Sequence, residues 1–450
     1  MSCRSVVSRS EAVSCADRSA LDLYERALVQ LHGYVGDPIA TIEQALAHAP
    51  DFVLGHAFRA LALLTSGERR FAEKARVSVV SAEALLPRAH PRERALVAAA
   101  RALLDGDWGR ACALLDRSLV DHPRDILASQ VAHLLDFFRG DSLNLRNRIA
   151  RVLPHWSADV PGYSYLLGMY AFGLEECNQY AEAEDTARHA LALEPKDAWA
   201  VHAGAHVMEM QGRIDEGIEW LTSREPDWAP ENGFAFHNFW HLALFHLDQS
   251  RPADALALYD VRIHAAPPDA ILPLIDATAL LWRLYLEGVE LGDRAVRVAD
   301  NWAARLDTER GFYAFNDMHA MLSFAMAGRD AEARQLEADL DWAAEHGART
   351  NRGMTREVGQ SICRAIRAFG EGRWADAIAG LEPVRDVAAR FGGSHAQRDI
   401  LSLTLVESAL RSGEPELARH YLAERIVLRP GSRWARRLGA RAEAVLQTGV

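Results

Sequence analysis

Cysteines and long apolar runs are both scarce in this sequence of 450 residues. No stretch approaches the roughly 18 consecutive apolar residues that would suggest a membrane-spanning helix. The N-terminus also lacks the continuous apolar stretch of a secretion signal, so we expect a cytoplasmic protein with no membrane partner. No two cysteines stand at the two-residue spacing of zinc or redox motifs, and we expect free thiols. They are Cys3, Cys15, Cys112, Cys177 and Cys363.

Positive charge is in deficit as well. The formal net charge is −12, and a negative field repels polyanions, so we expect no nucleic acid among the partners. Phosphate-binding loops, dinucleotide fingerprints, nucleophile elbows and thiolate zinc motifs are all missing, which excludes the commonest classes of enzyme. The exception to the acidic balance is a run of arginines near the C-terminus, which we interpret as a solvated helix face: Arg425, Arg429, Arg433, Arg436, Arg437 and Arg441.

A turn signal recurs along the whole chain, in which glycine or a small polar residue ends one helical pattern just before the next begins. The signals are spaced 31 to 44 residues apart. Such a period is typical of a helical solenoid, in which each helix pair buries its apolar face only by stacking on its neighbours. The signal residues are Gly36, Gly67, Gly106, Gly140, Asn178, Gly212, Ser250, Gly292, Gly328, Gly372 and Gly413.

The repeats that keep the pattern best fit the tetratricopeptide motif, with small residues where helices cross and a proline after the second helix. Around Asn178 these positions are Ala171, Ala183, Ala190 and Pro195. We therefore predict an all-α fold: a right-handed superhelical solenoid of about eleven tetratricopeptide-like helix pairs, either open or closed on itself. The predicted organisation is an N-terminal tail over residues 1–19, a single solenoid over 20–445 and a C-terminal tail over 446–450.

Four histidines stand out because they form two pairs at one-turn spacing on successive predicted helices. Residues four apart lie on the same helix face, so each pair can direct both imidazoles at one volume. Imidazole is a common metal ligand, and Zn, Fe or Mn are the candidate ions. Histidines that only hydrogen-bond across the groove are the alternative, because no fixed metal motif is present. The four are His202, His206, His237 and His241.

The first helix of each tetratricopeptide pair lines the concave surface, which predicts further inward-facing residues. A few polar groups among aromatic side chains suit a small-ligand pocket. Packing is the alternative for the tryptophans. The candidate ligand-binding residues are Trp199, Trp240, Asp276, Trp282, Asn316 and Arg398.

Several segments resemble the family of tetratricopeptide repeat protein thirty-eight over nearly the full length. The resemblance implies a closed or strongly curved solenoid of helix pairs, and it carries no activity. It supports the placement of Asp317 and His319 on an inner helix, where the periodicity alone puts them off the inward stripe. The segments are Ser19–Leu21, Tyr24–Leu28, Asp51–His56, His202–Met210, His237–His241, Phe315–His319 and Gly393–Asp399.

Two catalytic arrangements fit the candidate residues. In a metal-assisted hydrolysis or an oxygen-dependent reaction, Glu209 or Asp317 would act as the base beside the four histidines. Without a metal, His319 or His395 would be the general base, oriented by Asp317 or Asp399. Helix capping or salt bridges are the alternative roles for the two aspartates.

The expected function is therefore the binding of a small polar or aromatic ligand in a pocket lined by His, Asp and Trp, with a metal and catalysis as extensions. The acidic inner wall argues against an extended acidic peptide. The alternative is a non-enzymatic scaffold that holds a peptide or a partner helix in the groove, and a homodimer is a further candidate assembly.

Overall fold

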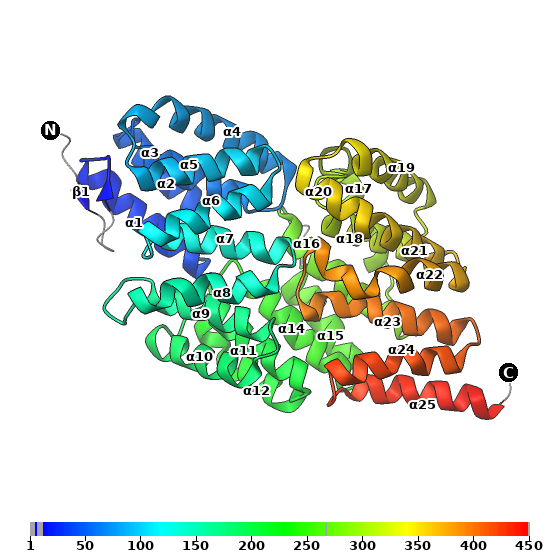
Figure 1. Cartoon of the computed structure of the whole chain (residues 1–450). Helices are drawn as coiled ribbons and strands as arrows, with labels where there is room; N and C mark the ends of the chain where they lie inside the picture. The colour runs from blue at the N-terminus through cyan, green and yellow to red at the C-terminus, as the bar shows by residue number, and fades with distance from the viewer. Residues whose placement is uncertain (1–4, 7–11, 266–267, 449–450) are drawn as a thin grey trace. The chain divides into compact units, whose positions relative to one another are not determined.

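The computed structural model describes residues 5–6, 12–265 and 268–448 (Figure 1). These residues are almost entirely helical, with one small hairpin of β1 (Ser5–Val6) and β2 (Ala12–Val13) near the N-terminus. The predicted all-α helical repeat is confirmed. None of the helices in the described part of the chain combines the length and the apolarity that a bilayer span requires. Four cysteines are free thiols, as expected, and Cys3 lies outside the described residues.

Every predicted turn residue, from Gly36 to Gly413, has a positive φ. A left-handed residue follows one helix, and the next residue is the N-cap of the following helix. In the Gly36-Asp37 turn, for example, the Asp37 carboxylate caps the next helix by accepting a hydrogen bond from the Ala40 amide. Asn178 and Ser250 adopt φ values of 61° and 62° without being glycine. The recurring sequence signal is therefore the junction between successive helices.

The chain divides into two compact units. The first unit comprises residues 1–204, 225–235 and 348–350, and the second comprises residues 205–224, 236–347 and 351–450. Within each unit, helices follow one another as antiparallel pairs. The first unit contains α1 (Arg18–Gly33), α2 (Pro38–His48), α3 (Val53–Leu64), α4 (Arg69–Ala84), η1 (Leu86–Arg88), α5 (Pro91–Leu104), α6 (Trp108–Asp121), α7 (Ile126–Phe138), α8 (Ser142–Val152), η2 (Leu153–His155), α9 (Tyr163–Glu175), α10 (Tyr180–Leu193) and α13 (Glu225–Trp228).

α11 (Ala198–Gln211) begins in the first unit and ends in the second. The second unit continues with α12 (Ile214–Ser223), α14 (Ala235–Asp248), α15 (Pro252–Leu258), η3 (Tyr259–Ile263), α16 (Ile271–Leu286), α17 (Arg294–Glu309), α18 (Ala314–Ala327), α19 (Asp330–His346), α20 (Arg349–Met354), η4 (Thr355–Gly359), α21 (Gln360–Gly370), α22 (Trp374–Leu381), η5 (Glu382–Phe391), α23 (His395–Arg411), α24 (Pro415–Leu428) and α25 (Arg433–Thr448). The first residue of α14 and the first two residues of α20 are assigned to the first unit. α1 thus begins two residues before the predicted start of the solenoid, and the proposed domain boundaries stay a prediction.

The interior of the second unit is built from the first helices of its pairs. α18 contacts α16 and α21, and α16 also contacts α23, which lies far away in the sequence. α16 is buried on nearly all sides because it is covered from more than one direction. The indole of Trp282 on α16 donates a hydrogen bond to the Thr404 hydroxyl on α23 at 2.9 Å. This packing brings polar groups on α14, α16 and α23 into one interior.

Candidate metal centre and neighbouring pocket

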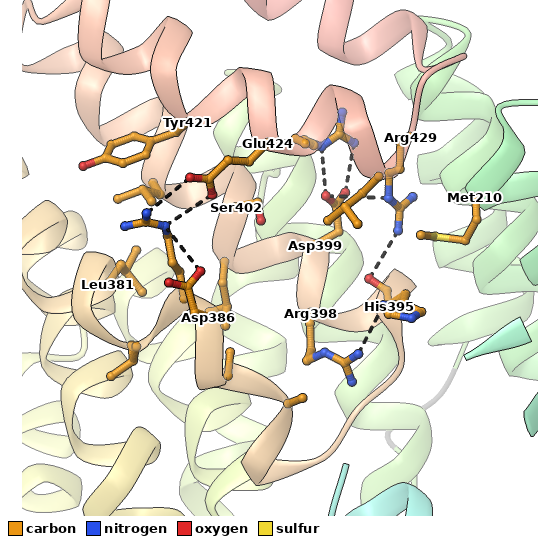
Figure 2. Close-up of a pocket in the computed structure, with 18 residues that line it drawn as sticks. Met210, Leu381, Asp386, His395, Arg398, Asp399, Ser402, Tyr421, Glu424 and Arg429 are labelled. Atoms are coloured by element: carbon orange, nitrogen blue, oxygen red, sulfur yellow. Dashed lines mark hydrogen bonds and ion pairs between the residues drawn. The ribbon is translucent and has the colours of Figure 1, made fainter. Parts of the chain in front are cut away.

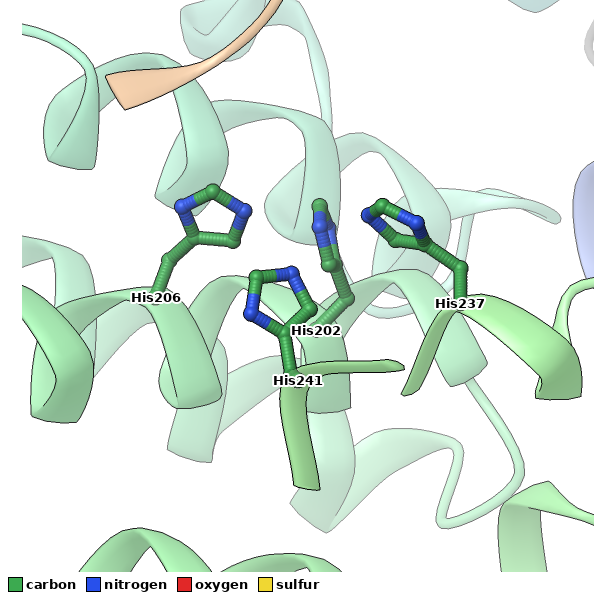
Figure 3. A group of neighbouring side chains, drawn as sticks. All are labelled: His202, His206, His237 and His241. Atoms are coloured by element: carbon green, nitrogen blue, oxygen red, sulfur yellow. The ribbon is translucent and has the colours of Figure 1, made fainter. Parts of the chain in front are cut away.

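Three histidines converge in the second unit (Figure 3). His206 lies on α11, and His237 and His241 lie one turn apart on α14. One ligand nitrogen of each lies within 4.8 Å of those of the other two. The ring centroid of His241 is 4.4 Å from that of His206 and 4.9 Å from that of His237. All three side chains are buried, so two helices supply imidazole nitrogens to one small, enclosed volume.

The fourth predicted histidine, His202, stands one turn before His206 on the same face of α11. It falls in the half of the helix that belongs to the first unit. There its ring packs against Phe172, Trp199 and Phe234 at centroid distances of 5.2, 5.0 and 5.2 Å. The helix thus keeps His202 in register with His206, as its spacing predicts.

Two of the converging histidines are each held by a buried carboxylate. Nδ1 of His241 lies 2.9 Å from Oε2 of Glu209, and Nδ1 of His237 lies 2.7 Å from Oδ2 of Asp276. An imidazole that donates from Nδ1 to a carboxylate presents the lone pair of Nε2. Proteins use the same arrangement to fix the tautomer and the orientation of histidine ligands around metal ions. Glu209 and Asp276 are therefore placed to orient imidazoles.

Burial controls the charge of this interior. Burial lowers the pKa of His241 well below its ordinary value, and the neighbouring cationic groups lower it further, so its imidazole is neutral at pH 7. Burial raises the pKa of Asp276, although His237 and Arg283 oppose that rise. Burial also lowers the pKa of the Arg283 guanidinium to about 10, against the attraction of Asp399 and Glu209. A neutral imidazole is the protonation state that a metal ligand needs.

A buried ion-pair network adjoins the histidines. Arg429 donates to Oε1 of Glu209 at 2.6 Å and lies 3.7 Å from Asp399. Arg425 forms a two-pronged pair with Asp399 at 2.8 and 2.9 Å. Burial raises the pKa of the Asp399 carboxyl, but Arg425 and Arg429 outweigh burial and hold that pKa far below its usual range.

The interpretation of the C-terminal arginine run as a solvated helix face is wrong for two of its members. The side chains of Arg425 and Arg429 are only 3% and 8% exposed. Both face carboxylates inside the second unit, so their charges are neutralised by partners rather than by water. Burial of a guanidinium requires such partners. Glu209 lies 220 positions from Arg429 in the sequence, so spacing alone could not pair the two.

A pocket of about 310 Å³ lies beside this network (Figure 2). It is lined by the end of α22, η5, α23, α24 and Arg429, together with Met210 next to Glu209 on α11. Three predicted site residues on the first turns of α23 reach it, namely His395, Arg398 and Asp399. Ser394 caps this helix by accepting a hydrogen bond from the Gln397 amide.

The candidate residues on α18 form a separate group. His319 is fully buried, and its Nδ1 donates to the Phe315 carbonyl at 2.8 Å. Burial lowers the pKa of His319 to about 3, which leaves it a weak base at neutral pH. Asp317 accepts a hydrogen bond from the Gly311 amide, and Asn316 is also buried. None of these three lines the pocket beside α23.

The three candidate tryptophans are all buried. Trp240 stacks on His237 at 5.3 Å, and the Arg283 guanidinium lies 5.2 Å from the Trp240 ring centroid. Trp282 packs against Tyr285 and Phe369. Trp199 belongs to an aromatic cluster of the first unit that includes Tyr34. Their contacts are those of core residues, which favours the packing alternative.

Comparisons with known proteins do not identify a family or a function for this chain. No protein-family model matches the sequence. Yeast Tom70 aligns with 90% of this chain and 92% of its own at 11% identity, with a TM-score of 0.41. Human IFIT1 with m7Gppp-AAAA aligns with 96% of each chain at 15% identity and a TM-score of 0.35. The TPR domain of P58(IPK) covers 80% of this chain and 99% of its own at 12% identity and a TM-score of 0.22.

These scores are too low to carry an argument about this chain. Its tetratricopeptide-like fold is established by its own helix pairs and left-handed junctions. The helical repeat implied by the family resemblance is confirmed in this way, and the narrower resemblance stays a prediction. The protein is therefore an all-α, tetratricopeptide-like helical repeat protein.

Proposed function

We propose that this protein binds a divalent transition metal ion through His206, His237 and His241, and that the bound metal serves the binding or conversion of a small molecule. The observation that carries the proposal is the pair of carboxylate-anchored imidazoles, His241 on Glu209 and His237 on Asp276. A core histidine needs no such partner to pack. Here carboxylates fix two imidazoles beside a third, and one ring nitrogen of each histidine lies within 4.8 Å of those of the other two. This arrangement resembles metal ligands whose rings are oriented before the ion binds.

The chemistry of the donors supports a choice among metals. All three candidate ligands are imidazoles, and the carboxylates of Glu209 and Asp276 are engaged with two of them and with Arg429. Imidazole sites suit Zn, Cu, Fe and Ni, whereas Mn prefers carboxylate and water oxygens. We therefore propose Zn²⁺ or Fe²⁺ and rank Mn²⁺ below them.

The number of ligands determines what the centre can do. Three protein ligands leave a coordination position for water or substrate, which is the pattern of catalytic zinc sites, whereas four protein ligands close the site. His202, one turn before His206, is the proposed fourth histidine. A His202→Ala variant that retains the metal would support the open centre, and one that loses it would support the closed, structural centre.

Glu209 takes a positioning role in this proposal. Its two oxygens accept from His241 and from Arg429. Both oxygens of the carboxylate are thus engaged, which fixes its orientation beside His241. A zinc ion held by these histidines would lower the pKa of a bound water to about 7 and so supply a nucleophile at neutral pH.

Metal analysis of the tag-free protein tests the proposal. We expect about one equivalent of zinc or iron per chain after gel filtration, and at least a tenfold lower content in His206→Ala and His241→Ala. His346→Ala is the matched control, because His346 is an exposed histidine of the same unit. A wild-type protein that retains no metal after incubation with Zn²⁺ and Fe²⁺ would refute the metal centre and give precedence to the peptide-binding scaffold.

A further inference from the structure

We propose that a small cavity in the first unit binds the primary ammonium group of a small amine. The cavity lies among the end of α1, α7, the first half of α9 and the start of α11. Every residue that lines it belongs to the first unit, whereas His206, His237 and His241 belong to the second. The inference therefore goes beyond the proposed metal function and does not depend on it.

A fully buried carboxylate lines this cavity. Asp197 stands directly before α11, where its Oδ1 accepts hydrogen bonds from the Trp199 and Ala200 amides at 3.1 and 3.0 Å. Within the described part of the chain, its other oxygen, Oδ2, has no hydrogen-bond partner. Oδ2 faces α9, because a Cβ at Gly168 would lie 3.0 Å from it. A buried carboxylate oxygen without a donor is costly, and a donor that carries positive charge compensates it best.

The groups around Asp197 favour its protonated form, so its carboxylate needs a further partner to ionise. Burial raises the pKa of Asp197 to about 7, against the hydrogen bonds from the Ala200 and Trp199 amides. The negative charge of Glu194 adds to the rise. A cation beside Oδ2 would have the opposite effect, because it favours the ionised form. The carboxylate is therefore neutralised either by a proton or by a bound cation.

Imidazoles and phenols supply the other titratable groups of the lining. Burial lowers the pKa of His133 to about 3, and Arg148 contributes to this lowering, so the imidazole is neutral at pH 7. Burial and the negative charge of Asp197 raise the pKa values of Tyr34 and Tyr165, which keeps both phenols protonated. Asp197 is the one acidic group among the lining residues. The imidazoles and phenols are those of His32, Tyr34, His133 and Tyr165.

The size and the walls of the cavity suit an ammonium group. Its volume of about 10 Å³ is close to the space that the centre of a single water molecule needs, and an ammonium group is of similar size. Tyr34, Tyr165 and Trp199 line the cavity, and electron-rich rings attract a cation. Tyr34, Leu134 and Tyr165 are half-buried, so a carbon chain attached to the ammonium group can extend past them. A trimethylated head group is too wide for this space.

Isothermal titration calorimetry on chelator-treated protein tests the inference with butylammonium, 1-butanol and butyltrimethylammonium. The chelator keeps the amine from binding through a metal. At pH 8 we expect butylammonium to bind at least about tenfold more tightly than either analogue, because butanol lacks the charge and the trimethylated group exceeds the space. Equal binding of either analogue, or no binding of butylammonium, would overturn the assignment. Displacement of butylammonium by an equal concentration of potassium chloride would also overturn it, because the site would then take inorganic cations.

The affinity for butylammonium should also depend on pH. The Asp197 carboxyl has a pKa of about 7, so below that pH a proton competes with the amine. Butylammonium itself keeps its charge up to about pH 10, as a lysine side chain does. The affinity should therefore fall by about tenfold for each pH unit between pH 7 and pH 5. The same affinity at pH 8 and at pH 5 would show that Asp197 is not the partner of the amine, and would overturn the proposal.

Two variants locate the site. Asp197→Asn keeps an oxygen for the helix cap but removes the charge, and it should weaken butylammonium binding at least about tenfold. Leu134→Trp should cover the half-buried side of the cavity without changing its charge, and should abolish binding. Asp185→Asn, at an exposed aspartate on α10, is the matched control and should bind as the wild type does. Wild-type affinity in Leu134→Trp would refute the site even if Asp197→Asn failed to fold.

Discussion

Nδ1 of His241 lies 2.9 Å from Oε2 of Glu209, while the other oxygen of the same carboxylate accepts from Arg429 at 2.6 Å. One carboxylate therefore joins the histidine centre to the ion-pair network of the pocket. Its role in a metal site would be to orient the His241 ring and to increase the basicity of its outer nitrogen.

Glu209→Gln should weaken zinc binding by about 10- to 100-fold, because a neutral amide still accepts a hydrogen bond but no longer polarises the imidazole. Competition with a chromophoric chelator measures this affinity. Glu219→Gln, which changes an exposed glutamate on α12, is the control and should bind zinc as the wild type does. Equal affinities in the two variants would show that Glu209 has no part in a metal site.

Asp399→Asn should destabilise the second unit by about 3 to 5 kcal/mol, because it removes the charge that compensates two buried guanidiniums. Urea denaturation at pH 7 measures the free energy of unfolding. Asp386→Asn, at an exposed carboxylate, is the control and should change it by less than about 1 kcal/mol.

The contribution of Asp399 also has a definite pH dependence. The carboxyl has a pKa below its unfolded value of 3.8, because Arg425 and Arg429 outweigh the effect of burial. The stabilisation is therefore fully present above about pH 4 and is lost as the pH falls through the folded pKa. If the difference in the free energy of unfolding between wild type and Asp399→Asn is the same at pH 7 and at pH 2, this prediction is wrong.

The Asp197 carboxyl should give the stability of the first unit the opposite pH dependence. Burial raises its pKa from 3.8 to about 7, although the Trp199 and Ala200 amides donate to its Oδ1. The unfolded chain loses the proton of this carboxyl at a lower pH than the folded chain does. The stability of the folded state should therefore fall as the pH rises from about 4 to 7 and then stay constant. Asp197→Asn keeps the amide oxygen as a cap and removes the titrating proton.

The stability of Asp197→Asn relative to wild type should consequently increase between pH 4 and pH 8 by a few kcal/mol, at about 1.4 kcal/mol for each pKa unit. Thermal unfolding at several pH values measures the difference. Asp185→Asn, at an exposed aspartate on α10, should show no comparable pH dependence. A constant difference between Asp197→Asn and wild type would show that the Asp197 carboxyl does not titrate in this range.

Ser250→Gly should stabilise the second unit by about 0.5 to 1 kcal/mol. Ser250 ends α14 with a φ of 62°, where a side chain is strained and glycine is not. Ser250→Ala is the control, since alanine has the same backbone restriction and should give no stabilisation. Chemical denaturation distinguishes the two, and equal stabilities would mean that the left-handed junction carries no strain.

Much of the fold could be predicted because each helix junction has a local cause. At Gly36-Asp37, for example, a left-handed residue is followed directly by the residue that caps the next helix. The spacing between such pairs of residues gives the period of the repeat. The histidine pairs could be found for the same reason, because residues four apart on a helix must share a face.

The rest of the candidate site depends on contacts that no local pattern contains. Arg429 meets Glu209 across 220 positions of sequence, and Arg283 donates to the Ala396 carbonyl across 113. A short-range periodicity can assign a residue to a face, but it cannot select which distant helix covers that face. This is why the sequence pattern indicates solvated arginines where the structure buries two of them, and why it does not pair Asp276 with His237.

Anomalous diffraction from crystals of the tag-free, zinc-supplemented protein, recorded at the zinc absorption edge, tests the metal centre most directly. We predict a single strong peak about 2.0–2.1 Å from one nitrogen of each of His206, His237 and His241. Crystals of His241→Ala grown in the same way should lack that peak. A wild-type map with no anomalous peak among these histidines, or with zinc bound only at surface residues, would contradict the metal centre.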